Sequence, residues 1–125
     1  MSVTEADLKL YVGIDNRLRM TIEQEDPSDP NSDIPLDTTG WTIEFIVKKI
    51  RSDAAAELSL TSAVVTEIED IDSSEGIWDV IASAAATADM TPGRRVLFVQ
   101  GTDASGLAHV IHDGSVTVLH GPTVA

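Results

Sequence analysis

The chain of 125 residues contains no cysteine. Neither a disulfide framework nor a thiolate metal site is therefore possible. Aromatic residues make up only 4% of the sequence, so few large side chains are present to fill an interior or to form a binding platform. A chain of this length can bury a hydrophobic core without covalent cross-links. We therefore expect a single domain over residues 1–125, with an ordered core over about residues 6–120.

Basic residues are scarce as well. Eight Lys and Arg stand against 21 Asp and Glu, which gives a formal net charge of −13. Such a charge repels the phosphates of nucleic acids and the surface of anionic membranes, so we expect neither as a partner. The simplest role of the charge is solubility.

Long apolar runs are missing too, and no segment approaches the ~20 residues of a membrane span. Residues 1–7 have neither the basic start nor the apolar centre of a signal peptide. We therefore expect synthesis in the cytoplasm without an export signal of the usual kind.

What the chain does contain is a series of short segments in which apolar and polar residues alternate. Trp41, Ile43, Phe45 and Val47 fall on one face of the clearest segment, which predicts a strand in the centre of a sheet. Trp41, Phe45 and Trp78 are expected in the core. Further strands are expected at residues 8–14, 17–23, 58–60, 64–71, 77–82, 95–101, 107–112 and 115–119. This spacing is typical of an antiparallel sandwich or barrel of about seven to nine strands.

Turn and helix signals divide these segments. Glu25–Asp33 contains two prolines and three aspartates, and it is interpreted as a loop. Ser83–Met90 is the one helix-favouring stretch, with Ser83 as a possible cap. Residues 91–93 and 103–106 are expected to turn, and Asp113-Gly114 is expected to mark a turn or a bulge.

A succession of short motifs spans residues 16–119: Arg17–Ile22, Pro35–Ile43, Gly76–Val80, Ala84–Asp89 before Thr91-Pro92-Gly93, and Asp113–Val118. In the order of these motifs the chain resembles the Ig-like domains of tailed-bacteriophage virion proteins, such as the N-terminal domain of baseplate upper proteins. The strand after Gly93 departs from the family pattern, because it has no tyrosine.

The resemblance implies an antiparallel Ig-like β-sandwich with one short helical turn near residues 83–90. It also implies a structural virion protein of the tail, baseplate, fibre region or capsid surface, made in the host bacterial cytoplasm. Such a protein acts by assembly with other virion proteins and with copies of itself. The alternative is a carbohydrate-binding module for host adhesion on the same scaffold, since fold alone does not separate the two.

No residues are singled out as catalytic or cofactor-binding. His109 and His112 are three apart, which on a regular strand puts them on opposite faces and prevents a shared metal, and His120 is isolated. Ser105 lies in Ala-Ser-Gly, which indicates a turn rather than a nucleophile elbow. The carboxylates are too many for any pair to stand out. We therefore expect no enzyme and no cofactor.

The acidic segment is a weak candidate for Ca²⁺, through Asp26, Asp29, Asn31 and Asp33. The spacing of Asp29, Asn31 and Asp33 matches the start of an EF-hand loop. The sixth position, however, is Ile34 rather than glycine, and the twelfth is Gly40 rather than glutamate, so an EF-hand is rejected. A solvated acidic turn is the simpler interpretation. Residues 67–75 form a second acidic run of the same kind.

All eight basic residues lie in or beside predicted strands, either to protect sheet edges or to form a basic stripe that docks an acidic partner or a sister subunit. The segment from Arg94 to Val99 has apolar side chains on both faces, which a strand exposed on one side should not have. It is covered either by residues 83–90 or by another subunit. The candidate interface residues are Arg94, Arg95, Val96, Leu97, Phe98 and Val99.

Overall fold

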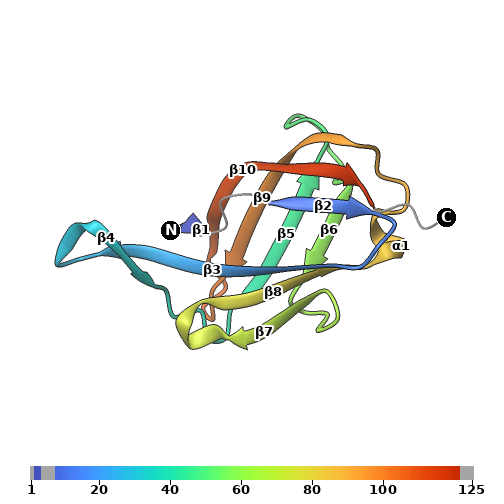
Figure 1. Cartoon of the computed structure of the whole chain (residues 1–125). Helices are drawn as coiled ribbons and strands as arrows, with labels where there is room; N and C mark the ends of the chain where they lie inside the picture. Colours follow the sequence, from blue (N-terminus) through green and yellow to red (C-terminus); the bar gives the residue numbers. More distant parts are fainter. Residues whose placement is uncertain (1, 4–7, 122–125) are drawn as a thin grey trace.

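Two β-sheets packed face to face form the protein in a computed structural model that describes residues 2–3 and 8–121 (Figure 1). The first sheet consists of β1 (Ser2–Val3), β3 (Asn16–Asp26), β4 (Asp29–Pro35), β7 (Ile68–Asp72) and β8 (Ile77–Ala82). The second consists of β2 (Lys9–Val12), β5 (Thr42–Lys48), β6 (Leu58–Thr61), β9 (Gly93–Thr102) and β10 (Ala108–His120). The helical elements are a 3-10 turn, η1 (Ser73–Glu75), and α1 (Ala84–Thr87). The predicted all-β sandwich is confirmed; residues 6–7 of the predicted ordered core lie outside the described residues.

The strand order is β1-β3-β8-β7 in the first sheet, with β4 also on β3, and β2-β10-β9-β5-β6 in the second. Every described pair is antiparallel except that of β2 with β10, which is parallel and was not predicted. The chain crosses between the sheets after β2, where Gly13 has a φ of 79°. The Asn16 side chain holds this corner, accepting from the Tyr11 N–H at 2.8 Å and donating to the Tyr11 carbonyl at 2.9 Å. β2 is thus separated from β3 and pairs with the edge of β10.

Alternating side chains of both sheets fill the core. In β5, the residues Ile43, Phe45 and Val47 are fully buried, as the sequence pattern predicted. The first sheet contributes Met20, Ile22, Trp78 and Val80, among others. Phe45 and Trp78 are therefore confirmed as core residues, whereas Trp41 is half-buried at the margin and packs against the core.

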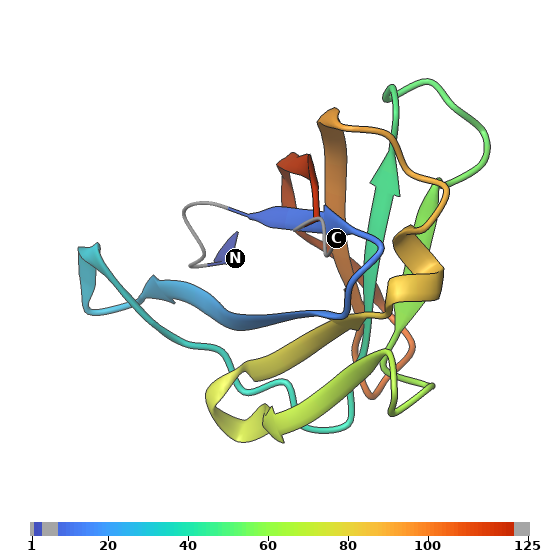
Figure 2. The ribbon, with the colours of Figure 1, turned by 45° about the vertical axis from the view of Figure 1, so that its right-hand side comes forward.

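The predicted loop at residues 25–33 is wrong. β3 runs on to Asp26, turns at Pro27-Ser28 and returns as β4, with Glu25 opposite Asp33. Figures 1 and 2 show this β3–β4 hairpin extending beyond the rest of the sandwich. Proline is tolerated in β4 because, among the strands that the structure describes, β4 pairs with β3 alone and so lies at an edge.

Two other boundaries also differ from expectation. Residues 64–67 form a turn rather than the start of a strand, because the Glu67 N–H donates to the Val64 carbonyl at 2.9 Å, and Val65 is 69% exposed. In the last strand the irregularity lies between Val110 and His112, so Asp113 and Gly114 continue the ladder opposite β9 instead of forming a turn. The alternation of apolar and polar residues does not predict local backbone hydrogen bonds or bulges of this kind.

The short helix and the β9–β10 turn are confirmed. Ser83 caps α1, since its Oγ accepts from the Ala86 N–H at 3.2 Å. In the hairpin turn, the Gly106 N–H donates to the Asp103 carbonyl at 2.9 Å. None of the helices in residues 8–121 has the length and apolar character needed to cross a membrane.

Truncation of Phe45 tests the core. Because this ring is fully buried between the two sheets, Phe45→Ala should lower the free energy of unfolding by about 3–5 kcal/mol in chemical denaturation. Val65→Ala, at an exposed turn position, is the matched control and should change it by less than about 0.5 kcal/mol. Equal effects of the two substitutions would contradict the assigned core.

Candidate interaction surface

β9 divides the candidate interface segment between the two sides of its sheet. Arg95, Leu97 and Val99 are buried inside the sandwich, at 7%, 0% and 0% exposure. Arg94 is exposed on the outer side, and Val96 and Phe98 are half-buried there. Only these three outer residues are therefore available to another molecule.

The outer side of β9 is partly covered by its own chain, but not by the predicted helix. Lys48 Nζ lies 5.9 Å from the centroid of the Phe98 ring, and Arg51 Cζ lies 5.1 Å from it, both as cation–π contacts. Arg51 is held in place by Asp113, with N–O distances of 2.9 and 2.7 Å. Residues 83–90 instead pack near β2, where the Gly13 N–H donates to Thr87 Oγ1. The predicted lid over this side of the sheet is thus wrong.

Cations gather around Val96 on this outer side. Lys48 is the cross-strand partner of Val96 on β5, and Arg94 is two residues away on β9. Lys9 on β2 lies in line with Arg94 across the sheet, because Thr117 of β10 is the cross-strand partner of both residues. We call the surface formed by Lys9, Lys48, Arg94, Val96 and Phe98 the cationic face. Among the residues that the structure describes, no ion pair involves Lys9, Lys48 or Arg94.

Arg95 has a different role from its neighbour Arg94. It points inward, where it donates to Glu57 at 2.8 Å and to the Thr91 carbonyl at 2.6 Å. Its charge is thereby paired at the margin of the core, and this residue closes one end of the sandwich rather than meeting a partner.

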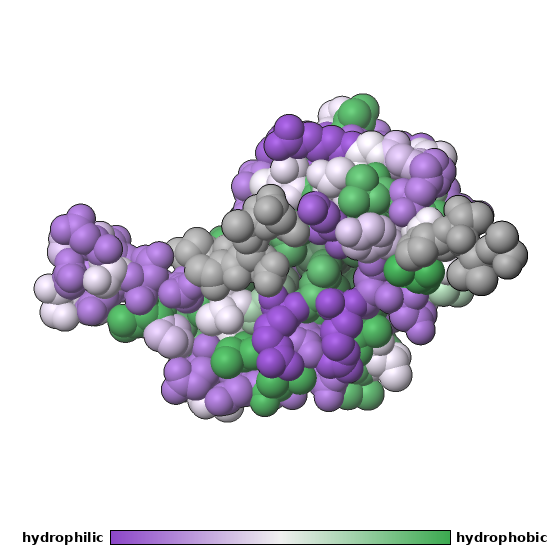
Figure 3. Space-filling view, viewed as in Figure 1, coloured by the Kyte–Doolittle hydropathy of each residue, from purple (hydrophilic) through white to green (hydrophobic). Residues whose placement is uncertain are grey.

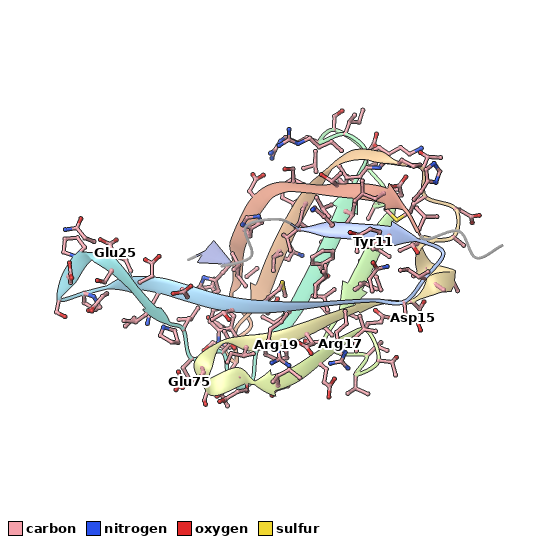
Figure 4. All side chains as sticks on the ribbon, viewed as in Figure 1. Tyr11, Asp15, Arg17, Arg19, Glu25 and Glu75 are labelled. Atoms are coloured by element: carbon pink, nitrogen blue, oxygen red, sulfur yellow. The ribbon has the colours of Figure 1, made fainter. Side chains whose placement is uncertain are left out.

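The first sheet carries a second group of arginines, which is already neutralised. Arg17 and Arg19 project from β3 toward β8 (Figure 4) and both bind the buried carboxylate of Asp79, while Arg17 also binds Glu69 at 2.9 Å. The hydrogen bond from Arg19 and then that from Arg17 hold the pKa of Asp79 below its usual value, although burial acts to raise it. These arginines tie β3 to β7 and β8 and leave little free positive charge.

The Ca²⁺ candidates all lie on the β3–β4 hairpin, where the side chains of Asp26 and Asp29 bond to the hairpin itself. Asp26 accepts from both the N–H and the hydroxyl of Ser28, which lowers the pKa of this carboxyl. Asp29 accepts from the Asn31 N–H at 3.0 Å and from the Ser32 hydroxyl. Asp33 lies opposite Glu25. Within residues 8–121 no group of three or more His, Asp or Glu side chains is arranged to hold a metal ion.

Carboxylates of the second acidic run are also bonded to the chain itself. Glu67 accepts from the Thr61 N–H, Glu69 binds Arg17, and Asp70 accepts from the Ser73 N–H at 2.8 Å. Asp70 therefore fixes the turn at η1, whereas Glu67 and Glu69 bond to residues outside it.

The prediction that His109 and His112 lie on opposite faces of the sheet is wrong. His109 pairs with Gly101 and His112 with Val99, which are two apart on β9, so the bulge between them returns both to one side of the sheet. His109 stacks on Trp41, with ring centroids 5.0 Å apart, and bonds Asp103 at 3.0 Å. His120 is exposed at the end of β10, and Ser105 lies in the hairpin turn as predicted.

Sequence reasoning missed the roles of Lys48, Arg51 and Lys9 beside the interface segment. These residues lie far from Arg94–Val99 in the chain. Strand pairing brings Lys48 and Lys9 beside this segment, and Arg51 reaches it over the Phe98 ring while bound to Asp113. The one signal in the sequence is that basic residues accompany the strands. Neither the family models nor the curated proteins with which the chain was compared give a match.

The pH dependence of stability tests the Asp79 cluster. A carboxyl with a lowered folded-state pKa stabilises the fold above its unfolded value of about 4, and this contribution is lost as the pH falls through the folded value. Asp79→Asn should therefore cost about 1–3 kcal/mol at pH 7, and the difference from the wild type should shrink below about pH 4.

Denaturant titrations at several pH values provide the measurement. The exposed Asp89→Asn, with the same change of charge, is the control and should cost less than about 0.5 kcal/mol throughout. A cost for Asp79→Asn that stays constant from pH 7 to pH 3 would show that its ionised form is not what stabilises the sheet.

Proposed function

We propose that this chain is a structural virion protein of a tailed bacteriophage, a component of the tail, baseplate, fibre region or capsid surface. It acts without catalysis, through contacts with other virion proteins and with copies of itself. The order of motifs that resembles phage Ig-like domains supports the virion context. The outer side of β9 supports the mode of action.

Most motifs of the resemblance fall in or directly beside elements of the sandwich. Arg17–Ile22 lies in β3, Gly76–Val80 leads into β8, and Asp113–Val118 lies in β10. The Ala-rich motif forms α1, and Pro92-Gly93 opens β9. One motif differs, because Pro35–Ile43 is largely the loop between β4 (which ends at Pro35) and β5 (which begins at Thr42).

The observation that carries the assembly role is the apolar outer side of a central strand. β9 has β10 on one side and β5 on the other, so it is not an edge strand. Its outward Val96 and Phe98, with Ile46 paired to Phe98 on β5, leave apolar side chains only half-buried on the outside of the sheet. Apolar surface with a charged rim is typical of a protein interface.

The carbohydrate-binding alternative has less support from the aromatic residues. A sugar platform needs exposed ring faces, but Trp78 is 4% exposed and its indole N–H donates to Thr38. Trp41 stacks on His109 and lies so close to Gly101 that an added Cβ there would come within 2.8 Å of the indole ring. Neither tryptophan therefore offers a free platform.

Mass spectrometry of purified phage particles tests the proposed function. The chain should be present in particles in a fixed ratio to the other virion proteins, as expected for a symmetric component. Its absence from complete particles, although it is expressed in the infected cell, would overturn the proposal.

Substitutions along β9 test the assembly surface. Val96→Asp and Phe98→Asp place a charge on the outer side, so each should abolish association while leaving the circular dichroism spectrum of the monomer unchanged. Leu97→Asp places the charge in the core and should unfold the protein, because an unpaired buried charge costs several kcal/mol. If the two outer variants assemble as the wild type does, this surface is not the interface.

A further inference from the structure

The β3–β4 hairpin carries strong negative charge without any cation of its own. We call residues 23–35 the arm; they include Glu23, Glu25, Asp26, Asp29 and Asp33 and no Lys or Arg. Figure 3 shows the arm projecting with a mostly hydrophilic surface, and Glu25 lies on it in Figure 4. No ion pair reaches these carboxylates from the rest of the described chain.

The carboxylates of one side of the arm face each other unfavourably. Glu25 is the cross-strand partner of Asp33, and Glu23 is that of Pro35, so these residues share one side of the hairpin. Like charges directly opposite each other on paired strands are destabilising. This side of the arm therefore presents three carboxylates beside a proline. An external cationic surface would relieve the repulsion among these carboxylates.

The cationic face has the opposite arrangement. Lys9, Arg94 and Lys48 lie in neighbouring rows of the second sheet around Val96. None of them forms an ion pair among residues 8–121, although Lys48 Nζ donates to the Asp53 carbonyl at 2.9 Å. In a protein with a net charge of −13, three such cations on one sheet side form a local surface of opposite sign. The two surfaces are complementary in charge, and each also offers apolar atoms.

The arm cannot reach the cationic face of its own chain. The arm belongs to the first sheet, whereas the cationic face is on the side of the second sheet that points away from the first. Figures 1 and 2 show the arm leading outward from the sandwich along β3. A contact between the two surfaces therefore requires two molecules.

We propose that the arm of one copy docks on the cationic face of a second copy, with Glu25 and Asp33 against Arg94 and Lys9. This contact deepens the proposed assembly function and rests on it. Because the two surfaces differ, the contact is head-to-tail, and repeated use of it closes a ring or extends a filament. The overall charge repels copies in most orientations, so only this local complementarity selects the pairing.

Charge exchange tests the contact. The arm variant is Glu25→Lys with Asp33→Lys, and the face variant is Lys9→Glu with Arg94→Glu. All four side chains are exposed and none belongs to a described ion pair, so both variants should fold, as circular dichroism checks. The control for the arm variant is Glu75→Lys with Asp89→Lys, which makes the same change of charge at exposed sites elsewhere.

Sedimentation velocity over a range of concentrations gives the readout. Each variant alone should associate at least about tenfold more weakly than the wild type, whereas the control should not. An equimolar mixture of the two variants should regain assembly, because the lysine arm meets the glutamate face and the acidic arm meets the original face.

The outcomes separate this contact from the proposed function. If the wild type assembles but the variants alone assemble equally well, or their mixture does not recover, the arm–face contact is wrong while the assembly role stands. A wild-type chain that stays monomeric at all concentrations also overturns the self-contact. Absence from virions, by contrast, overturns the function itself.

Discussion

The central position of β9 is the constraint on which the rest of the structure depends. The strand is hydrogen-bonded to β10 on one side and to β5 on the other, so its register fixes both neighbours. Its inner side chains, Leu97 and Val99, are fully buried against the core. With the inner side so determined, Val96 and Phe98 must point outward, because successive side chains of a strand alternate.

That constraint also explains the cations beside β9. An apolar ring on the outside of a sheet is costly in water, and Lys48 and Arg51 shield Phe98 only in part. Arg51 in turn depends on Asp113 of β10, so the shield joins three neighbouring strands. The outer side of the second sheet is therefore built as a surface with an apolar centre and a charged rim, which is the composition of an interface.

Charge is distributed unevenly between the two sheets, and net charge alone does not reveal it. On the first sheet Arg17 and Arg19 are ion-paired with Asp79, and the arm adds carboxylates but no Lys or Arg. On the second sheet the cations Lys9 and Arg94 stand without acidic partners among the described residues. Although the protein as a whole is acidic, it thus has an acidic surface on one side of the sandwich and a cationic surface on the other.

Much of the fold could be predicted from the sequence because burial on one side of a sheet imposes a period of two. The alternation of Ile43, Phe45 and Val47 and the cap at Ser83 are local signals of this kind. β4 was missed because the two prolines of residues 25–33 indicated a loop, although an edge strand, which β4 is among the described strands, can contain proline. The bulge near Ile111 and the parallel pairing of β2 depend on contacts between distant segments, which alternation does not encode.

The sequence predicted which strand carries the candidate surface, but not which of its side chains face outward. A strand that is apolar on both sides can be recognised in the sequence, so Arg94–Val99 was found. Which side faces out could not be decided until the neighbours of Leu97 were known. The partners of Phe98 come from residues some 50 positions away in the chain, and no spacing rule connects them.

The central claim is that another subunit covers the outer side of β9 in the assembled particle, and hydroxyl-radical footprinting of Phe98 tests it most directly. Phe98 is half-buried in the free chain and should be labelled there, while the fully buried Phe45 should not. Leu107, which is 62% exposed on the β9–β10 turn, serves as the reference in both samples. In purified particles the account predicts loss of Phe98 labelling relative to Leu107. Unchanged labelling of Phe98 in particles would show that this side of the sheet remains open to water and would contradict the account.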